Sequence, residues 1–406
     1  MTQSFTANSK KTSTMHGVPF KRLNQVRVGL IGVGGRGQSI LGELRVCEGA
    51  QILAVADERS DIIEAVKIKL AEGSEAQPDY YSGPDSWRKL LEKDLDLVYV
   101  ATSWQTHAPL AVAAMEAGKH TAVEVPAALT IEECWQLVET SERTRRHCVM
   151  LENCCYGYWE MLVKRMAEAG MFGTITHAEC AYIHNLRYHL QYQDWRRQAH
   201  IDYNGNLYPT HGLGPVAQCL KIGEGDAFDY LVSMSSREAS LSEYRDRTLP
   251  ADDRRRKEIY ACGDMNVSLL RTKQGRTIVL QHDVVTPRPY DRIFLIGGTK
   301  GTFRDYPMRL YLDDVTHSEE EWLNPEDYRA QWEDPLWKDQ GEQALKLGGH
   351  GGMDFLITYR LIQAIRAGLP PDMDVYDAVD WSAPGPLSAW SVAHRSAGID
   401  FPNFRR

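Results

Sequence analysis

The strongest constraint on the fold is a glycine pattern near the start of the chain. A β-branched run at residues 26–31 leads into Gly32-Val33-Gly34-Gly35-Arg36-Gly37, and a helical pattern follows. A strand, G-x-G-x-x-G and a helix in this order are typical of a dinucleotide-binding unit. The first glycine makes a sharp turn, the second lets the backbone approach a pyrophosphate, and the third lets the helix pack on its strand. Free N–H groups at the helix N-terminus favour the anion.

An acidic residue follows at the spacing that this unit requires. A second strand pattern at residues 51–56 ends in Asp57, about 20 residues after the glycines. A carboxylate in this position accepts hydrogen bonds from ribose hydroxyls and repels a 2′-phosphate. The sequence therefore predicts NAD as the cofactor rather than NADP. Arg59 is the one nearby residue that would favour the phosphate.

The hydrophobic pattern divides the chain into two domains. Strand and helix patterns alternate at residues 95–102, 108–117, 119–126 and 131–144, which predicts an N-terminal Rossmann domain with a doubly wound parallel sheet. Strand patterns then dominate, at residues 175–183, 228–234, 266–272, 276–283 and 292–297. They predict a C-terminal α+β domain with a largely antiparallel open sheet. We expect a flexible tail over 1–22, the first domain over 23–150 and the second over 151–406, with a helix at 381–395 packing back on the first domain.

Composition excludes several classes of function. The 406 residues carry 46 basic and 55 acidic side chains, a net charge of −9, which gives no bulk attraction to nucleic acid or anionic membranes. No run of about 18 apolar residues occurs, and residues 1–22 lack the apolar segment of a secretory signal. The eight cysteines show no C-x-x-C pair and no zinc-ligand spacing, which indicates free thiols in a reducing compartment. We expect a cytoplasmic protein with no metal site.

Further motifs in the first half resemble a known superfamily. Besides the glycines and Asp57, residues 102–109 read Thr-x-x-x-x-His-Ala-Pro, and Glu124-Val125-Pro126 follows. Together these resemble the glucose-fructose oxidoreductase / inositol dehydrogenase superfamily. Dehydrogenases of that superfamily usually carry a lysine between the Glu and the Pro, where it assists proton transfer. Val125 cannot move a proton, which argues against a simple dehydrogenase.

Five segments of the second half resemble one branch more closely. They are residues 150–156, 195–196, 205–215, 349–354 and 376–382. In this order they are similar to glycoside hydrolase family 109, the NAD-dependent α-N-acetylgalactosaminidases. The resemblance implies a small-molecule glycoside or glycan terminus as substrate. In the mechanism that it implies, NAD⁺ takes hydride from carbon 3 of the sugar, the proton on carbon 2 is removed and the aglycone leaves. Water then adds and the hydride returns, so no net redox occurs.

The resemblance also implies the residues of the site. The implied cofactor contacts, together with the glycines and Thr102, are Arg36, Asp57, Trp104, Gln105, Thr106, His107, Glu124, Val125 and Asn153. The implied sugar contacts are Tyr182, Arg196, Tyr208, His211 and Tyr290. His184 shares the face of Tyr182 if that segment is a strand.

Catalytic roles follow from the chemistry of these side chains. His and Tyr can carry protons in an enclosed site. We expect His211 to act as base for the 3-hydroxyl and Tyr182 to transfer the proton at carbon 2. Tyr208, Tyr290 and Arg196 should hold sugar oxygens, and Tyr208 is also a candidate proton carrier.

Two alternative functions remain, namely an NAD-dependent sugar or polyol dehydrogenase and a non-catalytic NAD and sugar sensor. An exposed sheet face in the second domain would suit a homo-oligomer.

Overall fold

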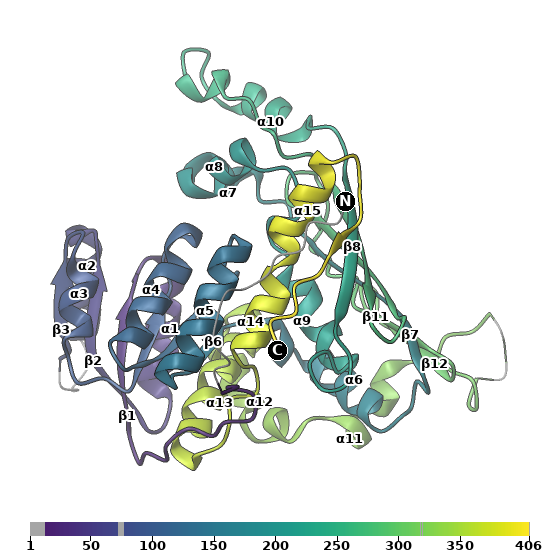
Figure 1. Cartoon of the computed structure of the whole chain (residues 1–406), viewed down its shortest axis with the longest axis horizontal. Helices are drawn as coiled ribbons and strands as arrows, with labels where there is room; N and C mark the ends of the chain where they lie inside the picture. Colours follow the sequence, from purple (N-terminus) through teal and green to yellow (C-terminus); the bar gives the residue numbers. More distant parts are fainter. Residues whose placement is uncertain (1–12, 72–76, 317, 319, 406) are drawn as a thin grey trace.

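Two β-sheets lie side by side with helices between them (Figure 1). The computed structural model describes residues 13–71, 77–316, 318 and 320–405. The first domain contains β1 (Val26–Ile31), α1 (Gly35–Val46), β2 (Ala50–Asp57), α2 (Ser60–Ala71), β3 (Asp79–Ser82), α3 (Ser86–Leu91), β4 (Leu97–Val100), α4 (Trp104–Glu116), β5 (His120–Val123), α5 (Ile131–Thr144) and β6 (Cys148–Met150).

The second part begins directly after β6. It contains η1 (Asn153–Tyr156), α6 (Tyr158–Glu168), β7 (Ile175–Ile183), α7 (Arg187–Tyr192), α8 (Asp194–Asp202), α9 (Thr210–Cys219), β8 (Phe228–Ser235), α10 (Ser240–Thr248), η2 (Arg254–Lys257), β9 (Asn266–Thr272), β10 (Thr277–Asp283), β11 (Leu295–Gly298), β12 (Gly301–Arg304) and β13 (Arg309–Leu312). It ends with η3 (Pro325–Tyr328), α11 (Arg329–Trp332), α12 (Pro335–Leu347), η4 (His350–Gly352), α13 (Met353–Ala367), α14 (Val375–Ser382), α15 (Pro384–Ala393) and β14 (Ile399–Asp400).

The first sheet is parallel throughout, with the strand order β3-β2-β1-β4-β5-β6. Its central strands are apolar and almost wholly buried, as expected of parallel strands that helices cover on both faces. The strands from β1 to β3 are added towards one edge of the sheet, and those from β4 to β6 are added towards the other edge. At the point between β1 and β4 where this order changes, an open α/β sheet leaves a crevice for a ligand. The predicted doubly wound Rossmann domain is confirmed.

The second sheet has eight strands in the order β13-β12-β11-β7-β10-β9-β8-β14. Neighbouring strands run antiparallel except β7 and β10, so the predicted, largely antiparallel sheet is also confirmed. Helices α9 and α15 cover one of its faces. The expected strand at 292–297 begins only at Leu295, because Ile293 has a positive φ of 48° that breaks the extended backbone.

The C-terminal segment divides between the two domains. Helix α13 packs on α1, and α14 packs on α5 and β6, whereas α15 lies along β8 of the second sheet. The segment 381–395, which we expected to pack back on the first domain, takes in only the last two residues of α14 and the whole of α15, and α15 packs on β8. The reason is a set of polar contacts on α15, whose Ser388 and Ser391 hydroxyls accept the backbone N–H groups of Asn206 and Ser233.

The expected flexible tail over 1–22 is wrong for the residues that the structure describes, which begin at Ser13. Met15 and Phe20 are buried, and Phe20 packs against His120 and His147. The hydroxyl of Tyr376 accepts a hydrogen bond from the Met15 backbone at 3.0 Å. Apolar side chains therefore attach this segment to both domains. Residues 1–12 lie outside the described part.

Two expectations from composition can be compared with the fold. Across the described ranges, no helix is long and apolar enough to cross a membrane. All eight cysteines are buried free thiols.

Helix α9 lies against β7 so closely that only a glycine fits between them. A Cβ atom on Gly212 would lie 2.7 Å from the backbone nitrogen of Ala181. We expect Gly212→Ala to lower the free energy of unfolding by about 1–3 kcal/mol, because the helix must move away from the strand. Urea unfolding followed by circular dichroism measures the change.

A matched substitution in α1 provides the control. A Cβ atom on Gly42 would meet nothing within 4 Å. Gly42→Ala should therefore raise stability by about 0.5–1 kcal/mol, since alanine is the better helix former. Equal stability of the two variants would contradict the close packing of α9 on β7.

Candidate active site

The glycine-rich loop has the shape that a pyrophosphate requires. Gly32 has a φ of +85°, and a Cβ on Gly37 would lie 2.0 Å from the Gly32 carbonyl oxygen, so both positions need glycine. A Cβ on Gly34 or Gly35 would meet nothing within 4 Å, which leaves open space in front of the loop. Helix α1 begins there with no side chain capping its free N–H groups. Loop and helix together fit the phosphates of NAD.

Asp57 lies at the end of β2, where its side chain binds the backbone of the glycine-rich loop. Its carboxylate accepts the backbone N–H groups of Val33 at 2.8 Å and Arg59 at 3.0 Å. The Arg59 guanidinium turns away and donates to Asp61, with Nε 3.2 Å from Oδ1. Arg59, the nearby cation that could have received a 2′-phosphate, is thus paired with another carboxylate, which agrees with NAD.

The segment after β4 is the first turn of α4 rather than a loop that precedes a helix. Trp104 is buried and Gln105 is exposed, while the Thr106 hydroxyl donates to that of Thr102 at 2.7 Å. The ring nitrogens of His107 lie 2.8 Å from the Pro126 carbonyl oxygen and 3.1 Å from that of Thr102. Burial lowers the pKa of His107, and the neutral ring that burial favours donates to one of these two carbonyl oxygens. His107 was expected to contact the cofactor, but its ring instead joins two loops.

Arg36 and Asn153 meet a carboxylate that the sequence analysis did not single out. The Arg36 guanidinium lies 2.6 Å from Glu124 and 2.7 Å from Asp354, which begins α13. Asn153 donates to the other oxygen of Asp354 at 2.5 Å, and His350 Nδ1 lies 2.8 Å from Asp354. Burial would raise the pKa of Asp354, but His350 and Arg36 lower it to about 2.

The only sequence signal for this pair was the His–Asp spacing of four residues where α13 begins. In the structure His350 precedes α13 in η4, and Gly351 and Gly352 have positive φ, so the contact with Asp354 comes from a turn at the start of the helix. Asp354 ties the nucleotide-binding loop to the second domain, and the hydrogen bond to Asp354 raises the pKa of His350.

Four of the predicted sugar residues line one cavity of about 500 Å³. They are Tyr182, His184, His211 and Tyr290. Tyr182 lies in β7 and His184 directly follows the end of this strand, and the Tyr182 hydroxyl lies 3.3 Å from His184 Nδ1. The Tyr182 ring lies 5.3 Å from that of His211 and 6.2 Å from that of Tyr290.

The other two predicted sugar residues lie beside this cavity. The Tyr208 ring is 4.7 Å from that of Tyr182 and 5.6 Å from that of Trp104, so it connects the cavity with the first domain. The Arg196 guanidinium lies 4.8 Å from the Trp195 ring and 5.0 Å from the Trp104 ring. These stacking contacts hold Arg196 behind Tyr208.

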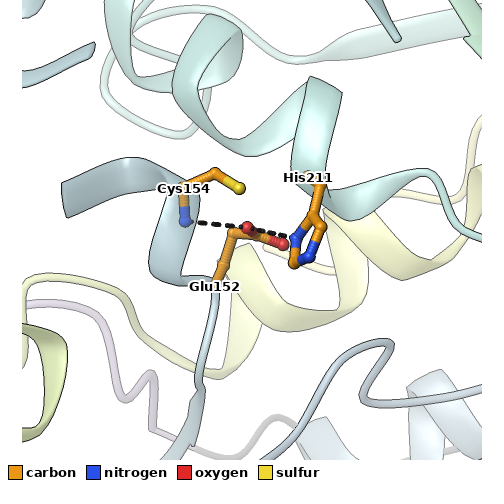
Figure 2. Close-up of side chains that lie close together, drawn as sticks. All are labelled: Glu152, Cys154 and His211. Atoms are coloured by element: carbon orange, nitrogen blue, oxygen red, sulfur yellow. Dashed lines mark hydrogen bonds and ion pairs between the residues drawn. The ribbon is translucent and has the colours of Figure 1, made fainter. Parts of the chain in front are cut away.

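A buried carboxylate orients His211, and Figure 2 shows this pair. Glu152 is fully buried, and its Oε1 lies 2.7 Å from His211 Nδ1. Burial would raise the pKa of Glu152, but His211 and the Cys154 backbone N–H outweigh it, so the carboxylate is ionised. An ionised carboxylate only accepts, so Nδ1 carries the hydrogen, and in the neutral ring the other nitrogen is the one that can accept a proton. The sequence analysis missed Glu152, although it lies in the matched segment 150–156.

The tyrosines of the site are protonated near neutral pH. Burial raises the pKa of Tyr182 to about 12 and raises those of Tyr208 and Tyr290 further. Tyr182 therefore enters any proton transfer as a phenol, able to donate. For Tyr182 to remove a proton from the sugar, its hydroxyl would first have to lose its own proton.

Glu152, Cys154 and His211 also form a cluster of the type that binds metals. One potential ligand atom from each lies within 4.8 Å of the others. However, the Arg292 guanidinium lies 2.8 Å from the Cys154 sulfur, and a cation next to a ligand disfavours a metal ion there. Burial raises the pKa of this thiol.

Comparison with known proteins agrees with both halves of this arrangement. Residues 26–152 match the family model described as oxidoreductase family, NAD-binding Rossmann fold. Residues 156–406 match the model described as glycosyl hydrolase 109, C-terminal domain. The first domain is therefore an NAD-binding domain, in agreement with its loop geometry.

Solved structures with low sequence identity share the fold. An NAD-binding oxidoreductase from Klebsiella pneumoniae has a TM-score of 0.72 at 16% identity, covering 94% of this chain and 100% of its own. An inositol dehydrogenase homologue from Azotobacter vinelandii, solved with NADH and myo-inositol, has a TM-score of 0.68 at 17% identity, covering 94% and 99%.

Sequence relatives are much closer. A glycosyl hydrolase family 109 protein from Solibacter usitatus is 53% identical, covering 97% of this chain and 92% of its own. Another from Shewanella amazonensis is 47% identical, covering 96% and 88%. The chain therefore belongs to glycosyl hydrolase family 109 and is an NAD-dependent glycoside hydrolase.

Proposed function

We propose that this chain hydrolyses N-acetylgalactosaminides, or a closely related hexosaminide, through transient oxidation of the sugar at carbon 3. The observation that carries the proposal is the Glu152–His211 pair, which presents an oriented base at the wall of the cavity. NAD⁺, when bound, supplies reversible storage of the carbon 3 hydride. The pair of acidic residues that flanks the scissile bond in most glycosidases is then not needed, because NAD-dependent glycosidases depart from that scheme.

The residues of the site support this cycle. His211 takes the proton of the 3-hydroxyl while hydride leaves carbon 3, and it returns that proton in the last step. Tyr182 is placed for proton transfer at carbon 2, and His184, whose Nδ1 lies 3.3 Å from the Tyr182 hydroxyl, can accept the phenol proton when Tyr182 takes that of carbon 2. Tyr290 and Tyr208 flank Tyr182 and can hold sugar oxygens. Val125 is buried and apolar, so the position where dehydrogenases of this fold carry a lysine holds no proton carrier.

The direct test is hydrolysis in deuterated water without added cofactor. We expect purified protein to release p-nitrophenol from the N-acetylgalactosaminide and to place deuterium at carbon 2 of the freed sugar, because the elimination breaks that C–H bond. N-acetylglucosaminides and galactosides of both anomers serve as comparison substrates. Release without deuterium would rule out oxidation and elimination. NADH accumulating from free sugar and NAD⁺, without release, would identify a net dehydrogenase.

Glu152 should act by positioning His211. Glu152→Gln keeps the size of the side chain but removes the charge that fixes the His211 tautomer. We expect kcat to fall roughly 100-fold or more, with KM changed little, since sugar contacts are untouched.

The content of NAD provides the control for this variant. Glu152 lies outside the glycine-rich loop, so the purified variant should carry as much NAD as the wild type. A kcat close to the wild-type value would show that the carboxylate does not orient the base.

We also propose that the chain forms homo-oligomers through the open face of the second sheet. This face exposes Tyr230, Met234 and Leu269. The opposite face of the same strands is buried under α15. An exposed apolar sheet face is typical of an association surface. Sedimentation velocity should give a dimer or larger species, and Met234→Lys with Leu269→Lys should give a monomer. A monomeric wild type at micromolar concentration would contradict the proposal.

A further inference from the structure

One carboxylate connects two of the residues that we expect to contact NAD. Arg36 comes from the glycine-rich loop of the first domain, and Asn153 comes from η1, directly after β6. Asp354 Oδ2 accepts a hydrogen bond from the Arg36 guanidinium at 2.7 Å, and Asp354 Oδ1 accepts one from the Asn153 amide at 2.5 Å. Asp354 is not itself among the expected contacts. It joins two segments that are both expected to meet the dinucleotide.

The positive charge of Arg36 is engaged in this connection. Its Nε lies 2.6 Å from Glu124, and its Nη1 lies 2.7 Å from Asp354. The Asp354 side chain is only 3% exposed and is ionised at neutral pH, because its neighbours lower its pKa to about 2. A phosphate would have to displace one of these carboxylates to bind the guanidinium. The geometry therefore suits Arg36 for holding the loop to α13 rather than for binding phosphate.

A second polar contact joins the same two helices one turn further along. Thr358 follows Asp354 by one turn of α13, and its hydroxyl donates to the buried Glu43 of α1 at 2.7 Å. Helix α13 also packs along α1. The N-terminus of α1 is the end that fits the phosphates of NAD. Contacts on two successive turns of α13 thus hold this helix in place.

We propose that Asp354 retains NAD, because its bond to Arg36 holds the glycine-rich loop against α13 and must open before the dinucleotide can leave. The inference rests on the proposed function, in which the hydride taken from carbon 3 returns to the same sugar. A cofactor that left between these two transfers would leave an oxidised sugar with no hydride to receive. A contact that must break before release acts on the dissociation rate.

The test measures how fast bound NAD exchanges. Purified protein is loaded with radiolabelled NAD⁺ and desalted, an excess of unlabelled NAD⁺ is added, and the label that stays on the protein is followed over time. Asp354→Asn keeps the size of the side chain and an oxygen for Asn153, but it removes the charge that holds Arg36. We expect this variant to lose the label roughly tenfold faster than the wild type.

Arg36→Lys tests the same contact without changing Asp354, and covers the case in which Asp354→Asn fails to fold. Lysine keeps the positive charge that a phosphate would need, but it lacks the planar fork that contacts Glu124 and Asp354 together. We expect this variant to lose the label several-fold faster than the wild type. The double variant should exchange no faster than Asp354→Asn alone, since both changes break one contact.

Asp372→Asn is the matched control. Asp372 forms two contacts of 2.8 Å with Arg360, and neither residue is among the expected NAD contacts. This substitution also removes a carboxylate from an arginine pair, so it reports what a general loss of packing does to the cofactor. The label should leave this variant at the wild-type rate. Exchange as fast as that of Asp354→Asn would contradict a specific role for Asp354.

A direct contact between Arg36 and the phosphates would give a different result. Asp354→Asn would then free the guanidinium for the phosphates and slow the exchange, and Arg36→Lys would leave the rate nearly unchanged. Either result would overturn the proposal, as would a wild type that loses the label as fast as Asp354→Asn.

The exchange rates do not depend on hydrolysis, so the two proposals can fail separately. Slow exchange that both variants accelerate would support retention by Asp354 even in a protein that releases no p-nitrophenol. Rapid exchange in a wild type that hydrolyses its substrate with deuterium at carbon 2 would overturn the retention alone.

Discussion

The buried ion pair between Arg36 and Asp354 fixes the relative position of the two halves of the site. Arg36 belongs to the glycine-rich loop, and Asp354 begins α13, more than three hundred residues further along the chain. Arg36 also pairs with Glu124, and Asp354 also pairs with His350, so this contact is the centre of a network of charges. Asn153 and His350 bind the same carboxylate, so the loop, η1 and η4 share one anchor. The position of the sugar cavity relative to the nucleotide groove depends on this anchor.

The sugar cavity depends on a second constraint, which is the close contact between α9 and β7. His211 comes from the first turn of α9, and Tyr182 comes from β7. Gly212 lets the helix approach the strand, so the two rings meet at 5.3 Å. Glu152 approaches from the end of the first domain and completes the pair with His211. Two proton carriers from distant segments therefore meet because one residue lacks a side chain, and a carboxylate from a third segment orients one of them.

Local patterns in the sequence predicted most of the fold. The glycines, Asp57 and the alternation of strands and helices each depend on neighbours within a few residues, so the Rossmann domain and the strands β7 to β10 lie close to where they were expected. Tyr182, His211 and Tyr290, which the family resemblance implied, and His184, which strand alternation suggested, line one cavity. Long-range partners left no such pattern. Asp354, Glu152 and Arg292 act through residues far away in the chain, and only the folded protein shows which charge meets which.

Two errors have the same physical origin. His107 stands in a motif associated with the cofactor, but its ring faces inward, where two carbonyl oxygens compete for it. Residues 13–22 are polar enough to predict a loose tail, but buried Met15 and Phe20, together with hydrogen bonds such as that of Met15 to Tyr376, attach it. The burial of a few apolar side chains can outweigh the polar composition of the segment that carries them. Composition alone does not show which side chains will be buried.

The charges around Arg36 determine how the loop must bind NAD. An arginine in a phosphate-binding loop normally neutralises the phosphates, but here Glu124 and Asp354 each lie within 2.7 Å of the Arg36 guanidinium, and Glu43 is 3.5 Å away. The positive charge of Arg36 is therefore already paired with these carboxylates. The negative charge of the pyrophosphate must therefore be met mainly by the free N–H groups of the loop and of α1. The open space at Gly34 and Gly35 is then essential, because only a bare backbone brings those groups close enough.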